Sequence, residues 1–97
     1  MRLFHRTSIV PIAIIALADE HFAALGLRRT AESPRSRTFT GDLGTVRISV
    51  RSEGGHYALI DAVSDQIGES RLDKSVKKFF NRVHRAADPH HAPTAGY

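Results

Sequence analysis

Basic side chains recur between residues 70 and 87 at the spacing of one face of an α-helix. The basic set is Arg71, Lys74, Lys78, Arg82 and Arg85, with Lys77 beside it. An apolar set recurs in the same way and comprises Leu72, Val76, Phe79, Phe80 and Val83. The centres of the two sets lie roughly 145° apart at about 100° per residue. The pattern predicts an amphipathic helix whose apolar side packs and whose basic side binds a polyanion.

The basic set has almost no acidic neighbours to neutralise it. Asp73 is the only acidic residue in this segment, whereas a solvated helix usually carries an acidic residue four positions from a basic one. The whole chain of 97 residues has a formal charge of +4, which favours anionic partners. Base contacts are expected from residues near the helix start: Arg71, Lys74, Ser75 and Lys78.

Two further arginines are candidates for the same surface. Residues 45–51 alternate strictly, so that Val46, Ile48 and Val50 share one side of a strand. Arg47 and Arg51 lie on the other side, where they either contact phosphates or keep the sheet soluble.

We therefore expect a small regulatory protein that binds DNA or RNA through the basic helix. A homodimer is compatible with this role, because a chain this small has little surface for specific recognition alone. The alternative is a small inhibitor or adaptor, of the kind that mobile genetic elements encode, which docks the same helix on an acidic protein surface. A membrane-surface role and a merely solvated helix face are also compatible with the pattern.

Catalytic and metal-binding patterns are weak. The chain has six histidines, but no two stand four residues apart as helix-borne metal ligands do, and it has no cysteine. His90 and His91 follow Asp88 in a proline-containing tail, where metal uptake would be adventitious. No nucleophile motif, glycine-rich phosphate loop or carboxylate pair stands out. We expect a non-enzymatic protein without catalytic residues, metal or cofactor.

The N-terminal apolar run has two interpretations. Arg2 and Arg6 precede the apolar residues 9–18, which end in a small-x-small site before Asp19, as in a secretory signal. The favoured interpretation is a core helix of a cytoplasmic protein, capped by Thr7 or Ser8 and ended by Gly26. The alternative is an exported protein that begins at Asp19. The run is too short to span a bilayer.

The elements that would position the basic helix follow from turn and cap signals. Residues 28–44 have the composition of a connector loop, and residues 45–51 and 56–60 form a hairpin. Asp61 is expected to cap a short helix containing Val63 and Ile67, which ends at Gly68. Ser70 and Asp73 resemble a capping box for the basic helix.

This order predicts an α+β fold: an N-terminal helix, a β-hairpin, a short helix and the basic helix. The last three suggest a winged helix-turn-helix arrangement. Residues 1–88 would form a single domain and residues 89–97 a flexible tail. The expected core comprises Ile12, Ile15, Phe22, Leu25, Val46, Ile48, Val50, Leu59, Val63, Ile67, Leu72, Val76, Phe79, Phe80 and Val83.

Residues 46–83 also resemble the N-terminal domain of phage antirepressors of the BRO type. The resemblance lies in a strand pair ending in Tyr57-Ala58-Leu59-Ile60, Asp61 opening a helix, a stop at Gly68 and a following helix with aromatic residues. It covers less than half of the chain and implies the hairpin-helix-helix order given above.

Overall fold

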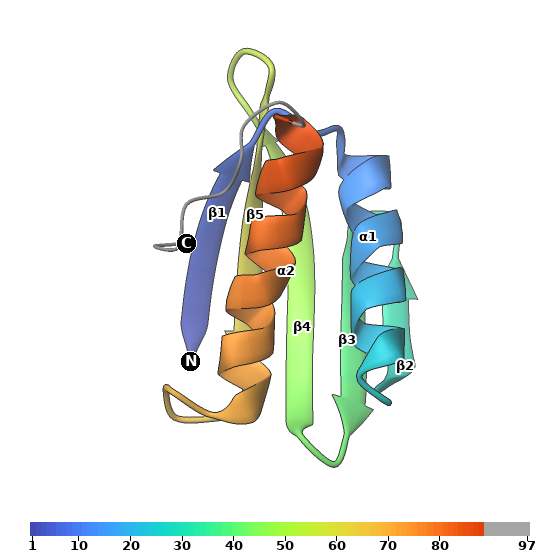
Figure 1. Ribbon diagram of the computed structural model, residues 1–97. Helices are drawn as coiled ribbons and strands as arrows, with labels where there is room; N and C mark the ends of the chain where they lie inside the picture. The colour runs from blue at the N-terminus through green and yellow to red at the C-terminus, as the bar shows by residue number, and fades with distance from the viewer. Residues whose placement is uncertain (89–97) are drawn as a thin grey trace.

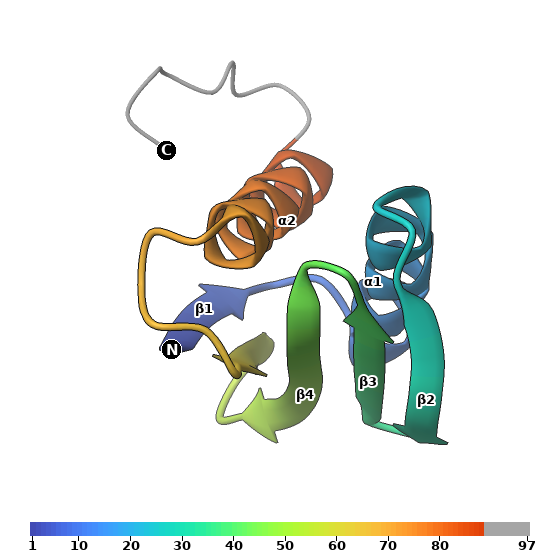
Figure 2. The same ribbon diagram turned by 90° about the horizontal axis from the view of Figure 1, so that it is seen from below.

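The computed structural model describes residues 1–88, which form an α+β fold of one sheet and two helices. The elements are β1 (Arg2–Thr7), α1 (Pro11–Ala24), β2 (Arg28–Ser33), β3 (Ser36–Gly41), β4 (Gly44–Glu53), β5 (Tyr57–Ser64) and α2 (Arg71–Ala87). The strands form a five-stranded antiparallel sheet in the order β1-β5-β4-β3-β2. Both helices cover one face of this sheet and run antiparallel to each other (Figure 1). Seen from below, the opposite face carries neither helix (Figure 2).

Helix α2 forms where the sequence predicts it, and its capping box is present. The Ser70 hydroxyl accepts a hydrogen bond from the Asp73 backbone N–H at 3.0 Å and donates one to Asp73 Oδ2 at 2.8 Å. The other carboxylate oxygen of Asp73 accepts from the Ser64 hydroxyl, so this buried side chain ties the start of α2 to the end of β5. The expected apolar face is buried against the sheet.

Helix α1 is also confirmed, although its N-cap differs from the expectation. Val10 occupies the cap position without a side-chain hydrogen bond, in place of Thr7 or Ser8, and Pro11 opens the helix. Proline is tolerated there because the first helical N–H has no intrahelical partner. At the other end the Leu27 N–H bonds the Phe22 carbonyl across Gly26, whose φ is +82°. This left-handed glycine is the expected helix stop.

The hairpin of β4 and β5 is confirmed, but the expected short helix after it is wrong. Asp61 lies in the middle of β5 and binds Arg2, so it caps no helix. Strand β5 continues to Ser64 because β4 pairs along it as far as Val46↔Ser64, while β1 pairs on its other side from Arg2↔Val63 to Thr7↔Ala58. The chain therefore has two helices within the described residues, and the helix-turn-helix order on which the antirepressor resemblance rested is absent from them.

The expected connector at residues 28–44 is wrong as well, because it contains strands β2 and β3. The side chains of β2 and β3 are mostly polar, so the sequence shows no alternation of apolar and polar residues in this segment. One side chain anchors them: Phe39 is buried and stacks on Phe22 of α1 at 5.0 Å between ring centroids. Arg37 adds a second link, since its Nε donates to Asp19 Oδ1 of α1 at 3.1 Å.

The core lies between the sheet and the two helices; five of the expected residues are not in it, and seven that were not expected are. Ile12, Leu25, Leu59, Val63 and Ile67 are not in it. The alternating residues of β5 supply the core instead, because β5 is a strand throughout. The buried residues that the expectation omitted are Ile14, Ala18, Leu27, Phe39, Ala58, Ile60 and Ala62.

The first eighteen residues are built into this core. They supply β1 and the first turns of α1, including the buried Ile14, Ile15 and Ala18. No helix within residues 1–88 is long and apolar enough to cross a membrane. The expected tail at residues 89–97, with His90 and His91, lies outside the described residues.

Candidate nucleic-acid interface

The outer face of α2 carries the basic set that the sequence singled out. Arg71, Lys74, Lys78 and Arg85 are exposed. None of these four forms an ion pair with a residue in the described part of the chain. They share this face because the residues on the other side of the helix are buried against the sheet. We call these four residues the helix cations.

The other two basic residues of α2 are held by carboxylates. Lys77 Nζ lies 3.3 Å from Glu69 Oε1, in the loop that precedes the helix. Arg82 Nη2 lies 3.0 Å from Glu20 Oε1, which belongs to α1. Of the six Lys and Arg residues of α2, two are therefore already paired with acidic side chains. The other four have no acidic partner within residues 1–88 and are open to a ligand.

The surroundings of α2 do not favour its insertion into a DNA groove, where its side chains would contact base edges. Ser75, expected near the bases, is 9% exposed, and its carbonyl accepts a hydrogen bond from His21 Nε2 of α1 at 2.9 Å. Helix α1 lies alongside α2 on the same face of the sheet (Figure 2). A groove-binding helix stands clear of its neighbours, so α2 is better placed to touch phosphates than base edges.

His21 is the titratable group between the two helices. Burial lowers the pKa of its imidazole below the usual value, and the charges of Arg82 and Lys78 act in the same direction. The Ser75 carbonyl opposes them. Burial is the largest of these causes, so His21 is neutral near pH 7 and packs as an aromatic ring, 5.6 Å from the Phe79 centroid.

Arg47 and Arg51 lie on the opposite face of the molecule from the helix cations. Their neighbours in β4, Val46, Ile48 and Val50, are buried under the helices, so alternation turns both arginines to the open face of the sheet. Neither forms an ion pair with a described residue. The eight predicted binding residues therefore do not form one surface.

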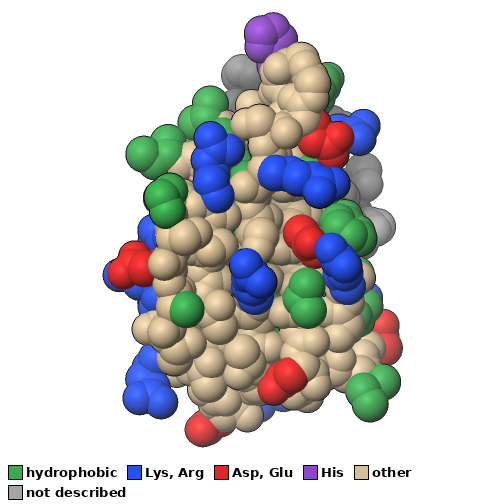
Figure 3. Space-filling view, turned by 180° about the vertical axis from the view of Figure 1, so that it is seen from behind, with side chains coloured by type: hydrophobic (Ala, Val, Ile, Leu, Met, Phe, Trp, Pro, Cys, Tyr) green, Lys and Arg blue, Asp and Glu red, His purple; other side chains and the backbone are tan. Residues whose placement is uncertain are grey.

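The open face holds further residues that sequence reasoning missed. Arg2, Phe4 and Arg6 of β1 lie on the same face. Arg2 and Arg47 are both directly opposite Val63 of β5, and side chains that are directly opposite in neighbouring strands point to the same side of a sheet. Tyr57 joins them from the start of β5, and Phe4 and Tyr57 are each 53% exposed. Figure 3 shows basic side chains spread over this face with hydrophobic ones among them. Residues 2–7 alternate in burial but not in residue type, so the sequence carried no clear signal for β1 or for its pairing with β5.

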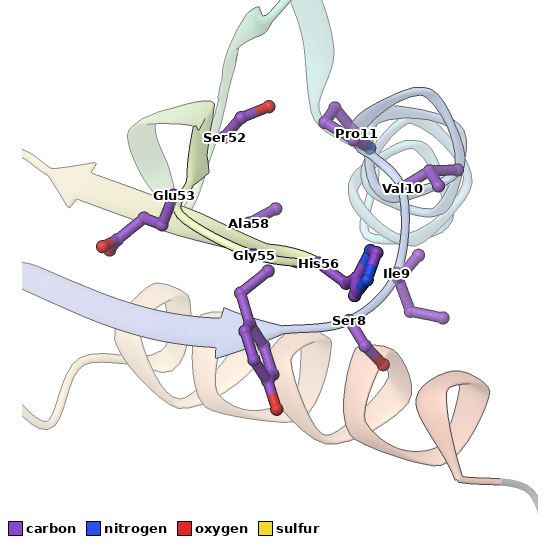
Figure 4. Close-up of a pocket in the computed structure, with 10 residues that line it drawn as sticks. Ser8, Ile9, Val10, Pro11, Ser52, Glu53, Gly55, His56 and Ala58 are labelled. Atoms are coloured by element: carbon purple, nitrogen blue, oxygen red, sulfur yellow. The ribbon is translucent and has the colours of Figure 1, made fainter.

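A shallow cavity of about 320 Å³ lies at the end of the sheet, between residues 8–11 and the β4–β5 turn. Figure 4 shows His56 next to Ile9, with Glu53 directed away from the cavity. Glu53 is bound by Arg6 at 3.5 Å. The lining includes Ser8, Ser52 and His56, but within residues 1–88 neither serine hydroxyl is hydrogen-bonded to the His56 imidazole. Within residues 1–88 no cluster of three or more His, Asp or Glu side chains is arranged to hold a metal.

Comparison with known proteins gives this chain no family: no family model matches it, and no curated protein sequence matches it either.

Proposed function

We propose that this protein binds nucleic acid, with the helix cations of α2 contacting the phosphate backbone. The observation that carries the proposal is the set of four exposed cations, Arg71, Lys74, Lys78 and Arg85, without acidic partners among the described residues. A polyanion supplies the missing counter-charges and releases its own condensed cations when it binds.

The spacing of the helix cations argues against a merely solvated face. Lys74 and Lys78 stand four residues apart, and Arg71 stands three residues before Lys74, so like charges are neighbours on the helix. Each such pair destabilises a helix by about 0.2–0.5 kcal/mol. A bound phosphate chain relieves this repulsion, whereas solvent alone only screens it.

The rigidity of α2 supports the same role. Its apolar face is buried, and its start is held by the hydrogen bonds of Asp73 to Ser64 and Ser70. The stems of the helix cations therefore project from a fixed backbone, and binding orders only the ends of the side chains. This lowers the entropy cost of association.

The test is a titration of a 20-base-pair DNA duplex over a range of salt concentrations. Wild-type affinity should fall steeply with salt, and Lys74→Gln/Lys78→Gln should reduce the slope of log K against log salt by about two. Undetectable binding of the duplex at low salt would refute the proposal.

The matched control is Arg28→Gln/Arg35→Gln, which removes the same charge elsewhere. Arg28 is the first residue of β2 and Arg35 lies in the β2–β3 turn, whereas α2 packs beside β1 and β5. This control should leave the slope for duplex DNA close to the wild-type value. An equal change in both variants would mean that overall charge, not the face of α2, attracts DNA.

A second candidate is docking on an acidic protein, and one observation favours it. Ile67 is 98% exposed in the loop that leads into α2, next to the basic face. A protein partner would bury this side chain and pair its carboxylates with the helix cations. Ile67→Ser then weakens the association strongly, while the same change leaves binding of duplex DNA unaltered.

A further inference from the structure

We infer that the open face of the sheet is a second binding site, which takes single-stranded nucleic acid. It lies on the other side of the molecule from α2 and does not depend on the helix cations. The bases would stack on exposed aromatic rings of β1 and β5, and the phosphates would contact arginines of β4 and β1.

The strand register places the four arginines at the corners of a rectangle. Arg2 and Arg47 flank Val63 on either side of β5, and Arg6 and Arg51 flank Leu59 in the same way. Four residues along a strand span about 13 Å, and two strand spacings span about 10 Å. The rectangle is wide enough for several nucleotides of an extended strand.

The charges of this rectangle are unequal on its two sides. On β1, Arg2 Nη2 lies 2.7 Å from Asp61 Oδ2, and Arg6 Nη2 lies 3.5 Å from Glu53 Oε2. On β4, Arg47 and Arg51 have no such partner within the described residues. The face is therefore positive along β4, and a phosphate chain is expected to follow that strand.

The aromatic rings lie on the β1 and β5 side of the rectangle. Phe4 pairs with Asp61 across the strands, and the Arg2 guanidinium stands 5.1 Å from the centre of the Phe4 ring. Because Asp61 holds Arg2 through two nitrogens, the ring and the guanidinium form an ordered stack. Tyr57 lies four residues before Asp61 on β5, about 13 Å away. The two rings therefore meet different bases.

This combination fits unpaired bases better than a duplex. Aromatic and guanidinium planes stack only on bases that are free of their own helix. The apolar Val63, 42% exposed, and the half-buried Leu59 between the arginines give the base planes further contact area. An acidic protein would satisfy the arginines without using the stack.

The experiment compares three ligands of equal length at fixed salt: oligo-dT of twelve nucleotides, the same backbone without bases, and a twelve-base-pair duplex. The wild-type protein should bind oligo-dT at least tenfold more tightly than the abasic strand. Phe4→Ala and Tyr57→Ala should each weaken oligo-dT binding by about tenfold and leave abasic binding unchanged.

A fluorescent variant provides a direct readout of stacking. The chain has no tryptophan, so Phe4→Trp introduces a single indole on the exposed ring position. Its emission should be quenched by oligo-dT and not by the abasic strand, and its thermal unfolding curve reports whether the fold is retained. Lys74→Gln/Lys78→Gln in the same background should preserve the quenching, because the helix cations lie on the other face.

Equal affinity for oligo-dT and the abasic strand would overturn the inference, since the face would then attract charge only. Preference for the duplex over oligo-dT, lost in Lys74→Gln/Lys78→Gln, would also overturn it but would leave the proposal for α2 standing. Binding of oligo-dT with no binding of duplex would support the sheet site and refute α2 as a nucleic-acid surface. Absence of binding by every ligand would refute both.

Discussion

The outer face of α2 and the open face of the sheet are both basic, but they differ in how the charge is arranged. On α2, Arg71, Lys74, Lys78 and Arg85 stand on one element with no ring among them. On the sheet, the four arginines come from two strands and enclose apolar and aromatic side chains. The first face can hold a phosphate chain by charge alone, whereas the second can also distinguish a base from its absence.

The two faces also differ in what keeps them in place. The face of α2 depends on the packing of one helix and on Asp73 at its start. The sheet face depends on the order β1-β5-β4, although β1 precedes β4 by about forty residues and β5 by about fifty. A change in β1 should therefore affect the sheet face first, and a change at Asp73 should affect α2 first.

Removal of residues 1–18 should have the largest effect, because both binding faces depend on the fold that these residues help to form. The deletion removes β1, with Arg2, Phe4 and Arg6, and eliminates the buried Ile14, Ile15 and Ala18. Each buried Ile or Leu lost from a core costs about 2–5 kcal/mol, so the remainder should not fold cooperatively. Thermal unfolding followed by circular dichroism checks this. A sharp transition in the truncated chain would show that β1 and α1 are dispensable.

Asp73→Ala should destabilise the protein by about 2–4 kcal/mol. The change leaves the Ser64 and Ser70 hydroxyls without their shared acceptor and removes the acidic residue from the first turn of α2. Urea denaturation measures the loss. Asp73→Asn keeps the shape and one acceptor oxygen and is expected to lose less. If the two variants are equally stable, the negative charge contributes more than the hydrogen bonds.

Asp61→Asn should strengthen binding of single-stranded oligo-dT by about two- to fivefold at low salt. The substitution removes a negative charge inside the arginine rectangle, which makes the sheet face more like that of α2, while the amide oxygen can still accept a hydrogen bond from Arg2 and keep it over the Phe4 ring. Duplex binding by α2 should not change. Fluorescence anisotropy with both ligands tests this, and a gain for duplex equal to that for oligo-dT would remove the distinction between the faces.

The smallest expected effect is a loss of folding stability on acidification, which comes from the histidine between the two helices. The folded-state pKa of His21 is below its ordinary value of 6.5, so the unfolded chain binds the proton more readily. This contribution to stability is complete above pH 6.5 and is lost as the pH falls through the lowered pKa. His5, lowered by burial and by His84, acts in the same direction.

Urea denaturation between pH 5 and pH 8 measures this dependence. His21→Gln should flatten it in part, because glutamine does not titrate while its amide can still bond the Ser75 carbonyl. Arg47→Gln, on the sheet face, serves as the control and should leave the pH dependence unchanged. An unaltered profile in His21→Gln would assign the effect to other groups.

Local signals predicted the elements that are complete within one segment. The apolar spacing and the Ser70–Asp73 cap located α2, and the alternation of Val46, Ile48 and Val50 with two following glycines located the β4–β5 hairpin. The helix stop at Gly26 was also readable, since a left-handed glycine with an apolar residue after it is a local feature. The helix cations could be named for the same reason.

The errors fell where a distant partner overrides a local preference. Asp61 looked like a helix cap, but β5 runs straight through it because β4 and β1 pair on its two sides, with Ser49 and Phe4 opposite this residue. Residues 28–44 looked like a loop because their strands are polar; Phe39 and the ion pair of Arg37 with Asp19 fix them under α1. A local pattern can indicate a strand, but it does not indicate which distant strand pairs with it.

The sequence by itself determined the two helices, the central hairpin and the excess of positive charge, because helix spacing, caps and turns act over a few residues. Only the tertiary structure decided that Arg47 and Arg51 lie away from α2 and next to Phe4, Tyr57, Arg2 and Arg6. The cause is the sheet order, in which β1 pairs with β5 and the alternation of each strand sends these side chains to the face that the helices leave open.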